Sequence, residues 1–473
     1  MIPACGGWLT RAADREIPVP VKRLYAGDMY RFGQPQPSLW EATAGDVRVK
    51  GTALSRDEHC EVAIIGGGYT GVSAAYHLCR DHQIDTRVLE AGHIGWGASG
   101  RNAGFCGIGG TSLTLKQTLA KFGIGETRRF YQSQLEGIEL VRRIILDENI
   151  DAEMLGEAEL EVAPSRKLFS QLAEHAKMQR ELLGLDNRIV SSAEFRSSFF
   201  DSTELHGAVV QRPAFSLHPM RYLLGMAAAA ERHGAKLHPF SEVLEWTRRA
   251  NEHVLVTAGG SLRARNVILA TNGFMPEHLH SAFYGRPLPM ISAIVVTRPL
   301  TGDELAAHSW RTVNSAITAK RILNYYRLLP DNRMLFGGRG HTTGSDEGAM
   351  KTFAGLEDRF RRLWPLWRNI PVEYRWHGLI CITLRLTPSI GRLREDPSVL
   401  FAYGFHGNGV NTATWSGKQL AGWLIARGTC DDQEPERLPR MVRGLSPRFP
   451  FAALRLRYLQ ARLALFRLQD ALD

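Results

Sequence analysis

Apolar residues recur along this chain at two spacings, one typical of strands and one typical of helices. The apolar runs at residues 62–65 and 86–89 each have the length of a short buried strand. Between these runs, apolar positions follow the helical period. A strand, a helix and a second strand in this order predict a βαβ unit with two parallel strands.

The same two patterns predict further elements along the chain. Helices are expected over residues 126–150, 165–183 and 217–234, and from about 410 to about 426. Strands are expected at 160–162, 254–257, 267–270 and 399–403. Residues 286–340 are rich in strand patterns and include a hairpin of 324–329 and 333–336 around the turn Pro330-Asp331-Asn332.

The two ends of the chain differ from this middle part. Residues 1–55 contain Pro18, Pro20, Pro35 and Pro37, which predict an extended arm. Residues 445–473 are rich in arginine and carry apolar residues on one helical face. We expect this tail to pack on the body of the protein, with contact to an anionic membrane surface as the less favoured alternative.

Glycines in the first predicted unit point to a nucleotide. The turn after the first strand reads Gly66-x-Gly68-x-x-Gly71 and opens the predicted helix. Such glycines allow a tight turn, a close approach of the backbone to a pyrophosphate, and close packing of helix on strand. The helix N-terminus attracts phosphate, and Glu90 ends the second strand, where a carboxylate accepts the ribose hydroxyls of an adenosine.

A second glycine-rich stretch follows this unit. Residues 95–104 read GWGASGRNAG, and Gly107, Gly109 and Gly110 come shortly after. This density of glycine disfavours regular helix or strand. It suits a loop that lies against a flat ligand.

Composition and charge restrict the class of protein. A chain of 473 residues with 44% hydrophobic and 22% charged residues is typical of a soluble protein of roughly two or three domains. No stretch has the length of a membrane span or the pattern of a secretory signal. The six cysteines form no CxxC pair, so we expect reduced thiols, no metal site and a cytoplasmic location. The net charge of +10 comes without a nucleic-acid-binding module, so no nucleic-acid partner is expected.

Three glycine-rich segments occur in a characteristic order: GGGYTG at 66–71, GWGASGRNAG at 95–104 and GFHGNGV at 404–410. Together they resemble the FAD-dependent amine and amino-acid oxidoreductases of the D-amino-acid oxidase superfamily, which includes glycine and sarcosine oxidases. Within it the chain is most similar to the γ-glutamylputrescine oxidoreductase subfamily. This closer similarity rests on residues 37–44, 95–102, 270–273, 326–328, 331–338 and 388–393.

The resemblance implies an α/β fold with two domains. One is a discontinuous, Rossmann-like FAD-binding domain of residues 56–110, 200–280 and 376–430. The other is an α+β substrate domain of residues 111–199 and 281–375, built on a mixed sheet. The arm of residues 1–55 and the basic tail of residues 431–473 lie outside both.

The resemblance also implies FAD as the cofactor and suggests which residues contact it. The first turn would hold the pyrophosphate, Val243 would contact the adenine, and the helix after residue 409 would point at the flavin pyrimidine, whose reduced form is anionic. The residues expected to bind FAD are Gly66, Gly68, Tyr69, Thr70, Gly71, Glu90, Ala91, Gly97, Ala98, Ser99, Arg101, Asn102, Val243, Ala270, Thr271, Gly407, Asn408, Gly409 and Val410.

The implied reaction is oxidation of a C–N bond in an amine, by hydride transfer to flavin N5 and hydrolysis of the resulting imine. The best candidate substrate is γ-glutamylputrescine or a related polyamine or amino-acid catabolite, with O2 or another electron acceptor as the oxidant. A pocket with aromatic and cationic groups suits this chemistry. The candidate catalytic residues are Tyr325, Arg327, Arg339, His406 and Lys320, with Tyr326 as a further candidate.

Each candidate has a structural alternative. Arg339 could pair with a substrate carboxylate through two hydrogen bonds, and Lys320 could place a positive charge near the flavin. The residues of the 320–339 segment could equally occupy surface positions of a hairpin.

The carboxy-terminal glycine motif departs from its relatives, which commonly read Gly-x-Ser-Gly-His-Gly-Val. Here His406 stands at the serine position and Asn408 at the histidine position. His406 is therefore either a hydrogen-bonded loop residue or a contact to flavin or substrate.

Two cysteines bear on how FAD would be held. A cysteine in a segment similar to that of Cys381 holds FAD covalently in sarcosine oxidase-like enzymes. We expect non-covalent FAD here, with attachment through Cys381 as the alternative and through Cys106 as a weaker one.

Two rival functions remain open from the sequence. One is a sarcosine- or pipecolate-type oxidase or dehydrogenase of secondary amino acids. The other is a flavin-holding subunit, without turnover, of a larger membrane-associated dehydrogenase.

Overall fold

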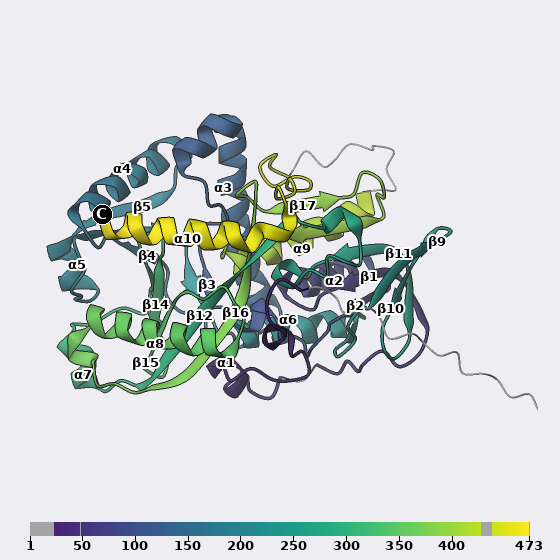
Figure 1. Ribbon diagram of the computed structural model, residues 1–473, viewed down its shortest axis with the longest axis horizontal. Helices are drawn as coiled ribbons and strands as arrows, with labels where there is room; N and C mark the ends of the chain where they lie inside the picture. The colour runs from purple at the N-terminus through teal and green to yellow at the C-terminus, as the bar shows by residue number, and fades with distance from the viewer. Residues whose placement is uncertain (1–22, 48, 427–437, 473) are drawn as a thin grey trace, which may run out of the picture.

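The computed structural model describes residues 23–47, 49–426 and 438–472 (Figure 1). Its core contains two large sheets that face each other across a cavity. Residues 1–22 of the predicted arm, and residues 427–437 at the boundary of the predicted FAD domain and tail, lie outside the described residues. Among the described helices, none is long and apolar enough to cross a membrane.

The first sheet is the predicted nucleotide-binding sheet. Its parallel strands are arranged in the order β18-β11-β1-β2-β8. Strand β17 extends the β18 edge in antiparallel fashion, and an antiparallel ribbon of β9 and β10 branches from β11. The bounds are β1 (Glu58–Ile65), β2 (Thr86–Leu89), β8 (Lys236–His238), β9 (Glu245–Arg249), β10 (Glu252–Val256), β11 (Ser261–Leu269), β17 (Ser389–Arg392) and β18 (Val399–Tyr403).

Both faces of this sheet are buried, which explains why its strands are continuous apolar runs. Val62 and Ile64 point into a core shared with four helices, whereas Ala63 and Ile65 point into a second core on the opposite face. The helices of the first core are α2 (Tyr69–His82), α3 (Leu115–Asp147), α6 (Pro219–Arg232) and α9 (Gly409–Ala426).

Helix α3 differs most from its predicted bounds. It begins at Leu115, behind a capping box in which Thr114 and Gln117 exchange hydrogen bonds, and not near residue 126. Gly123 interrupts the helix with φ 78°, and Gly125 follows it closely. This interruption hides the first turns from a search for regular periodicity.

The second sheet is mixed, with the order β16-β12-β15-β14-β13-β4-β6-β5. Only the β13–β4 pair is parallel. The predicted hairpin is confirmed, because β14 and β15 pair in antiparallel fashion with Tyr326 opposite Phe336. The bounds are β4 (Glu159–Val162), β5 (Asp186–Ser191), β6 (Gly207–Arg212), β12 (Pro287–Pro299), β13 (Ser315–Thr318), β14 (Asn324–Leu328), β15 (Arg333–Arg339) and β16 (Val372–Thr383).

The mixed sheet buries one face and turns the other toward the nucleotide sheet. The buried face carries an aromatic cluster that includes Tyr326, Phe336 and Trp364. Helix α8 (Asp346–Leu363), which was not predicted from the sequence, covers this face through Phe353, Leu356 and Phe360. Three further helices, α4 (Arg166–Leu183), α5 (Ser192–Ser198) and α7 (Gly302–Ala307), lie in the same part of the molecule as the mixed sheet.

Two strands of the mixed sheet lie across the predicted domain limits. Strand β6 falls within the range 200–280, and most of β16 falls within 376–430, both of which were assigned to the FAD domain. The exact limits of the two domains remain a prediction.

The carboxy-terminal helix α10 (Arg455–Leu472) packs on the body of the protein and crosses the mixed sheet (Figure 1). Leu459 and Leu463 bury their side chains against Leu288 and Met290 of β12. The small elements of the described chain include α1 (Leu39–Ala42), several 3-10 turns, and the ribbon of β3 (Phe105–Cys106) and β7 (Phe215–Ser216).

Candidate functional site

A cavity of about 450 Å³ lies between the carboxyl ends of the parallel strands and the inner face of the mixed sheet. Its first wall contains the residues that directly follow β1, β2, β11 and β18. Its second wall includes Ser292, Ile317 and Tyr325 of the mixed sheet. Ligands of open α/β sheets bind at the carboxyl ends of the strands, so this cavity is the candidate site.

The glycines of the first turn are needed where they stand. Gly66 has φ 112°, a conformation that residues with a Cβ rarely adopt. A Cβ on Gly71 would lie 1.9 Å from the carbonyl oxygen of Gly66, so Gly71 lets α2 pack against the turn and does not line the cavity itself. The α2 N-terminus opens into the cavity, where the Tyr69 amide donates to Ser99 Oγ at 2.9 Å.

Glu90 is held in place by backbone donors. Its Oε2 accepts from the Gly67 amide at 2.7 Å, and its Oε1 accepts from the Gly92 amide at 3.0 Å. Burial raises the pKa of this carboxyl, which the backbone donors partly counteract. Glu90 and Ala91 line the cavity, as does Val243 on the next segment.

Arg101 offers an unused donor to the cavity. Its Nε donates to the Trp96 carbonyl at 2.6 Å and its Nη1 to the His377 carbonyl at 3.3 Å. Its buried Nη2 has no partner among the described residues, and neither has the hydroxyl of Thr271. Burial lowers the pKa of Arg101 to about 9. An unpaired buried donor costs free energy. Oxygen atoms of a bound ligand could accept hydrogen bonds from both groups. In this respect the site fits an anionic dinucleotide.

The carboxy-terminal glycine loop forms the end of the cavity at helix α9. His406 has φ 55° and contacts Ser112 Oγ at 2.8 Å through Nδ1. Burial lowers the pKa of His406 to about 3, so the ring is neutral near neutral pH. The Asn408 amide donates to the Gly107 carbonyl and to Gln134, each at 3.1 Å, and thereby ties the start of α9 to its surroundings.

Nearly all residues that the sequence suggested for FAD line this cavity. Gly71 is the exception, for the packing reason above. The residues that line the cavity are Gly66, Gly68, Tyr69, Thr70, Glu90, Ala91, Gly97, Ala98, Ser99, Arg101, Asn102, Val243, Ala270, Thr271, Gly407, Asn408, Gly409 and Val410. Their individual roles toward FAD remain predictions.

The proposed catalytic residues separate into two groups. Tyr325, Arg339 and His406 line the cavity. Arg327 does not, because its buried Nη2 donates to the Leu217 carbonyl at 2.7 Å and its guanidinium lies 5.5 Å from the Trp40 ring. Lys320 also lies elsewhere, where it pairs with Glu204 at 3.4 Å.

Strand alternation explains the different positions of two neighbouring tyrosines. Tyr325 points to the cavity, where its hydroxyl and Ser292 Oγ lie 2.8 Å apart. Gly337 lies opposite it in the sheet and leaves room for the ring, since a Cβ there would lie 2.2 Å from Tyr325. Tyr326, also a candidate from the sequence, points to the other face and stacks on Phe336 in the core.

Two carboxylates in the cavity wall, Glu159 and Glu242, were not predicted from the sequence, and Glu242 is paired with Arg23 at 2.8 Å. Glu159 lines the cavity from β4, and its side chain has no hydrogen-bond or ion-pair partner among the described residues. Burial, with a smaller contribution from Glu161, raises the pKa of Glu159 to about 8. Burial also raises the pKa of Glu161 to about 7. The signal was present in the alternation Glu159, Leu160, Glu161, Val162, which places both carboxylates on one face of a strand.

The two cysteines occupy different environments. Cys381 lines the cavity but is fully buried, and burial raises the pKa of its thiol to about 12. Because the thiolate is the nucleophile, this environment disfavours a covalent link to flavin. Cys106 points into the hydrophobic core beside α3 and does not line the cavity.

Comparison with known proteins places this geometry in a family. The γ-glutamylputrescine oxidoreductase of Escherichia coli (strain K12) is 29% identical over 425 residues, which cover 86% of this chain and 94% of that protein. The 4-methylaminobutanoate oxidase (formaldehyde-forming) of Paenarthrobacter nicotinovorans is 37% identical over 402 residues, which cover 79% of this chain and 45% of that protein. The crystal structure of glycine oxidase from Geobacillus kaustophilus shares the fold with a TM-score of 0.66 at 20% identity, over 83% of this chain and 100% of that chain.

The family profile described as "DAO: FAD dependent oxidoreductase" matches residues 61–423. This range contains both sheets, apart from the first three residues of β1, and every residue of the cavity wall except Phe32. The chain therefore belongs to the DAO family of FAD-dependent oxidoreductases.

Proposed function

We propose that this FAD-dependent oxidoreductase oxidises a C–N bond of an amine, with γ-glutamylputrescine as the leading candidate substrate. The observation that carries the proposal is the unpaired carboxylate of Glu159 in the cavity wall. A carboxylate that faces the cavity without a protein partner is suited to a cationic amine, whose charge would favour the ionised carboxylate.

The residues of the first wall would hold FAD. The α2 N-terminus and the glycine turn suit the pyrophosphate, Glu90 suits the ribose, and the start of α9 suits the electron-rich end of the flavin. When bound, FAD supplies the hydride acceptor for C–N oxidation.

Glu159 would both bind the amine and hold its proton. The carbon next to an ammonium group cannot release hydride, because the nitrogen has no free lone pair to form the imine. The substrate ammonium therefore has to lose a proton first. A carboxyl whose pKa is raised to about 8 can accept that proton at its Oε atom, since the match to amine basicity is closer than for an ordinary glutamate.

The remaining wall orients the substrate and excludes water. Phe105 and Tyr325 meet edge to face with ring centroids 6.0 Å apart, and Ile317 lies nearby on β13. The Tyr325 hydroxyl is fixed by Ser292, so this aromatic surface is rigid. A rigid apolar wall beside one carboxylate suits a flexible aliphatic amine.

The choice of γ-glutamylputrescine rests on the relatives. That compound and 4-methylaminobutanoate, named in two similar proteins, both carry an amine at one end and a carboxylate at the other. A second candidate class is the secondary amino acids, such as sarcosine and pipecolate. Arg339 supports this second class, because it lines the same cavity and is suited to a carboxylate.

The proposal is tested by following flavin absorbance in the purified holoenzyme under anaerobic conditions. Amines are added one at a time: γ-glutamylputrescine, putrescine, sarcosine, pipecolate and D-alanine. Bleaching by γ-glutamylputrescine at low concentration is the expected result. Bleaching by sarcosine or pipecolate alone would favour the second class, and a flavin that no amine bleaches would refute amine oxidation by this panel and favour a flavin-holding subunit.

The electron acceptor is tested separately. Release of hydrogen peroxide in air would identify O2 as the acceptor. Turnover only with an added quinone or dye would identify the protein as a dehydrogenase.

A further inference from the structure

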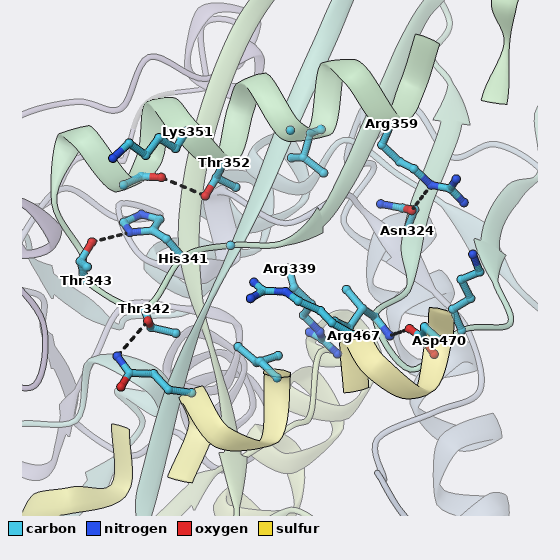
Figure 2. Close-up of a pocket in the computed structure, with 18 of the residues that line it drawn as sticks. Asn324, Arg339, His341, Thr342, Thr343, Lys351, Thr352, Arg359, Arg467 and Asp470 are labelled. Carbon is cyan, nitrogen blue, oxygen red and sulfur yellow. Dashed lines mark hydrogen bonds between the residues drawn. The ribbon is translucent and has the colours of Figure 1, made fainter. Parts of the chain in front are cut away.

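A second hollow lies between helices α8 and α10, outside the cavity that faces the nucleotide sheet. This α8–α10 groove has a volume of about 910 Å³, which is in the range of small-molecule sites (Figure 2). It contains six cationic side chains and two acidic ones, a formal excess of four positive charges. The cationic residues are Lys320, Arg339, Lys351, Arg359, Arg362 and Arg467.

Three of these cations already pair with carboxylates, and two of the three share one carboxylate. Arg359 and Lys320 pair with Glu204, Arg359 through two hydrogen bonds. Lys351 pairs with Glu347 at 2.6 Å. These pairs fix the groove wall but leave little charge for a ligand.

The other three cations have no carboxylate partner in the described part of the chain. These are Arg339 at the end of β15, Arg362 near the end of α8 and Arg467 on α10. Arginines that line one hollow without a counter-ion give it a positive potential. A bound anion would offset this potential and could accept hydrogen bonds from several guanidinium groups.

Arg339 lines both the groove and the flavin-facing cavity, so the two hollows are neighbours at this side chain. In Figure 2, Arg339 and Arg467 project into the same space between the two helices. Burial lowers the pKa of Arg339, a cost that an approaching anion would offset.

Helix α10 is fixed in place as a wall of this groove. Arg455 at its start pairs with Glu277, and Asp470 near its end accepts from the Ile322 amide at 2.9 Å. Gln460 between them donates to Thr342 Oγ1 at 3.1 Å. The helix thus bridges the segment after β11 and the β13–β14 loop, and these contacts hold the wall of the groove in place.

We propose that the α8–α10 groove binds a carboxylate at the far end of the amine substrate, through Arg362 and Arg467, while the amine end reaches Glu159. This inference rests on the proposed amine oxidation and assigns a specificity site to it. It predicts that the enzyme prefers elongated amines with a distal carboxylate over amines of equal length that lack the carboxylate.

The first test measures anaerobic flavin reduction by γ-glutamylputrescine and by its α-carboxamide analogue, in which an uncharged amide replaces the carboxylate. In the wild type we expect the carboxamide to require about 10- to 100-fold higher concentration for half-maximal reduction, because charged hydrogen bonds are lost. The double variant Arg362→Gln/Arg467→Gln should weaken γ-glutamylputrescine by a similar factor. The limiting rate of reduction and the behaviour of the carboxamide should stay the same.

A matched control removes the same charge from the same two helices. Arg361 is the neighbour of Arg362 and pairs with Glu357, and Arg462 lies over the ring of Phe466; neither lines the groove. The variant Arg361→Gln/Arg462→Gln should leave the preference for the carboxylate intact. An equal loss in both double variants would show a general effect of net charge and overturn the proposal.

A second test does not depend on turnover. Calorimetric titration of the holoenzyme with glutarate should show binding that the Arg362→Gln/Arg467→Gln variant weakens and the control variant retains. Glutarate should also compete with γ-glutamylputrescine. Binding without competition would identify a separate anion site and overturn the proposal, as would unchanged glutarate binding in the variant.

The two proposals can fail separately. If no amine reduces the flavin but glutarate binding depends on Arg362 and Arg467, amine oxidation is wrong and the anion site stands. If amines reduce the flavin with no preference for a distal carboxylate, the reaction stands and the groove assignment is wrong.

Discussion

The two walls of the cavity are built by different means. On the side of the parallel sheet, the ligand would meet mainly backbone: the glycine turn at Gly66, the α2 N-terminus and the start of α9 at Gly409. On the side of the mixed sheet, it would meet individual side chains, such as Glu159 and Tyr325. A wall made of backbone depends on glycines at fixed spacing, whereas a wall made of side chains depends on which face of a strand each residue occupies.

This difference predicts which changes are tolerated. On the nucleotide side, any added side chain is harmful, because the backbone itself has to approach the ligand. On the substrate side, neighbouring residues of one strand should respond in opposite ways. Substitutions on each side, with matched controls, test whether the two walls respond differently.

The largest effect is expected from Gly71→Ala. The added Cβ would lie 1.9 Å from the Gly66 carbonyl oxygen, so the turn and α2 would have to separate. We expect the affinity for FAD to fall by about 100-fold or more, equivalent to ~3 kcal/mol, as measured by flavin titration of the apoprotein. Gly355→Ala in α8 is the control, since its Cβ meets nothing within 4 Å and should stabilise the helix by about 0.5 to 1 kcal/mol without changing flavin affinity. Wild-type flavin affinity in Gly71→Ala would show that close packing at the turn is unnecessary.

The next effect is expected from Glu159→Gln. Removing the carboxylate should lower kcat/KM for the amine by about 10- to 100-fold. The wild-type kcat/KM should rise as pH increases through about 8, because the carboxylate form of Glu159 appears there, and this step should be absent in the variant. Glu161→Gln is the matched control on the same face of β4, and it should lose less activity because Glu161 does not line the cavity. Equal pH profiles in wild type and Glu159→Gln would exclude Glu159 as the proton acceptor.

The raised pKa of Glu159 also predicts how the stability of the apoprotein depends on pH. The pKa of Glu159 is raised from 4.5 to about 8 on folding, so the native state holds this proton more tightly than the unfolded state. The free energy of unfolding of the apoprotein should therefore fall as pH rises from about 4.5 to about 8, because the unfolded state loses this proton first. Denaturant titrations at the two pH values should show a smaller fall for Glu159→Gln than for the wild type.

A smaller effect should distinguish the two tyrosines of β14. Tyr325→Phe removes the hydroxyl that contacts Ser292, and we expect a loss in kcat/KM of about 2- to 5-fold from a less rigid wall. Tyr326→Phe changes a residue on the buried face and should leave kcat/KM unchanged, within about 1.5-fold. Measured kinetics that reverse this order would show that the cavity lies on the other face of the sheet.

The smallest effect is expected at Cys381. The variant Cys381→Ala should keep the same flavin content, and acid denaturation should release all flavin from the wild type, because a thiol with a pKa of about 12 is a poor nucleophile. Flavin that stays with the acid-precipitated wild type, but not with Cys381→Ala, would demonstrate a covalent link.

The nucleotide-binding half could be predicted from the sequence because its requirements are local. Gly66, Gly68 and Gly71 need a particular backbone at a fixed spacing, and Glu90 follows directly from the next strand. Both strands and the helix between them appear where the apolar pattern placed them. The hairpin of β14 and β15 was predictable for the same reason, since its turn residues lie between two apolar runs.

The substrate side depended on contacts between segments far apart in the chain. Arg327 and Arg339 lie on paired strands and carry the same charge, yet only Arg339 reaches the cavity, because Arg327 is held by the distant Leu217 carbonyl. Lys320 is likewise drawn away by Glu204 on another segment. Helix α8 and strand β16 were not predicted. Helix α8 packs on the buried face of the mixed sheet, and β16 extends the edge of that sheet, so both depend on long-range contacts.

The family, the cofactor class and the glycine framework follow from the sequence alone, because they depend on backbone geometry that few residues can adopt. Which charged and aromatic side chains meet depends instead on how the two sheets and their helices pack. This packing brought Glu159 of β4 to the cavity wall, and it brought Arg362 of α8 and Arg467 of α10 into one groove. Charges act through space at short range, so their partners are set by the packing of the two sheets and not by their spacing along the chain.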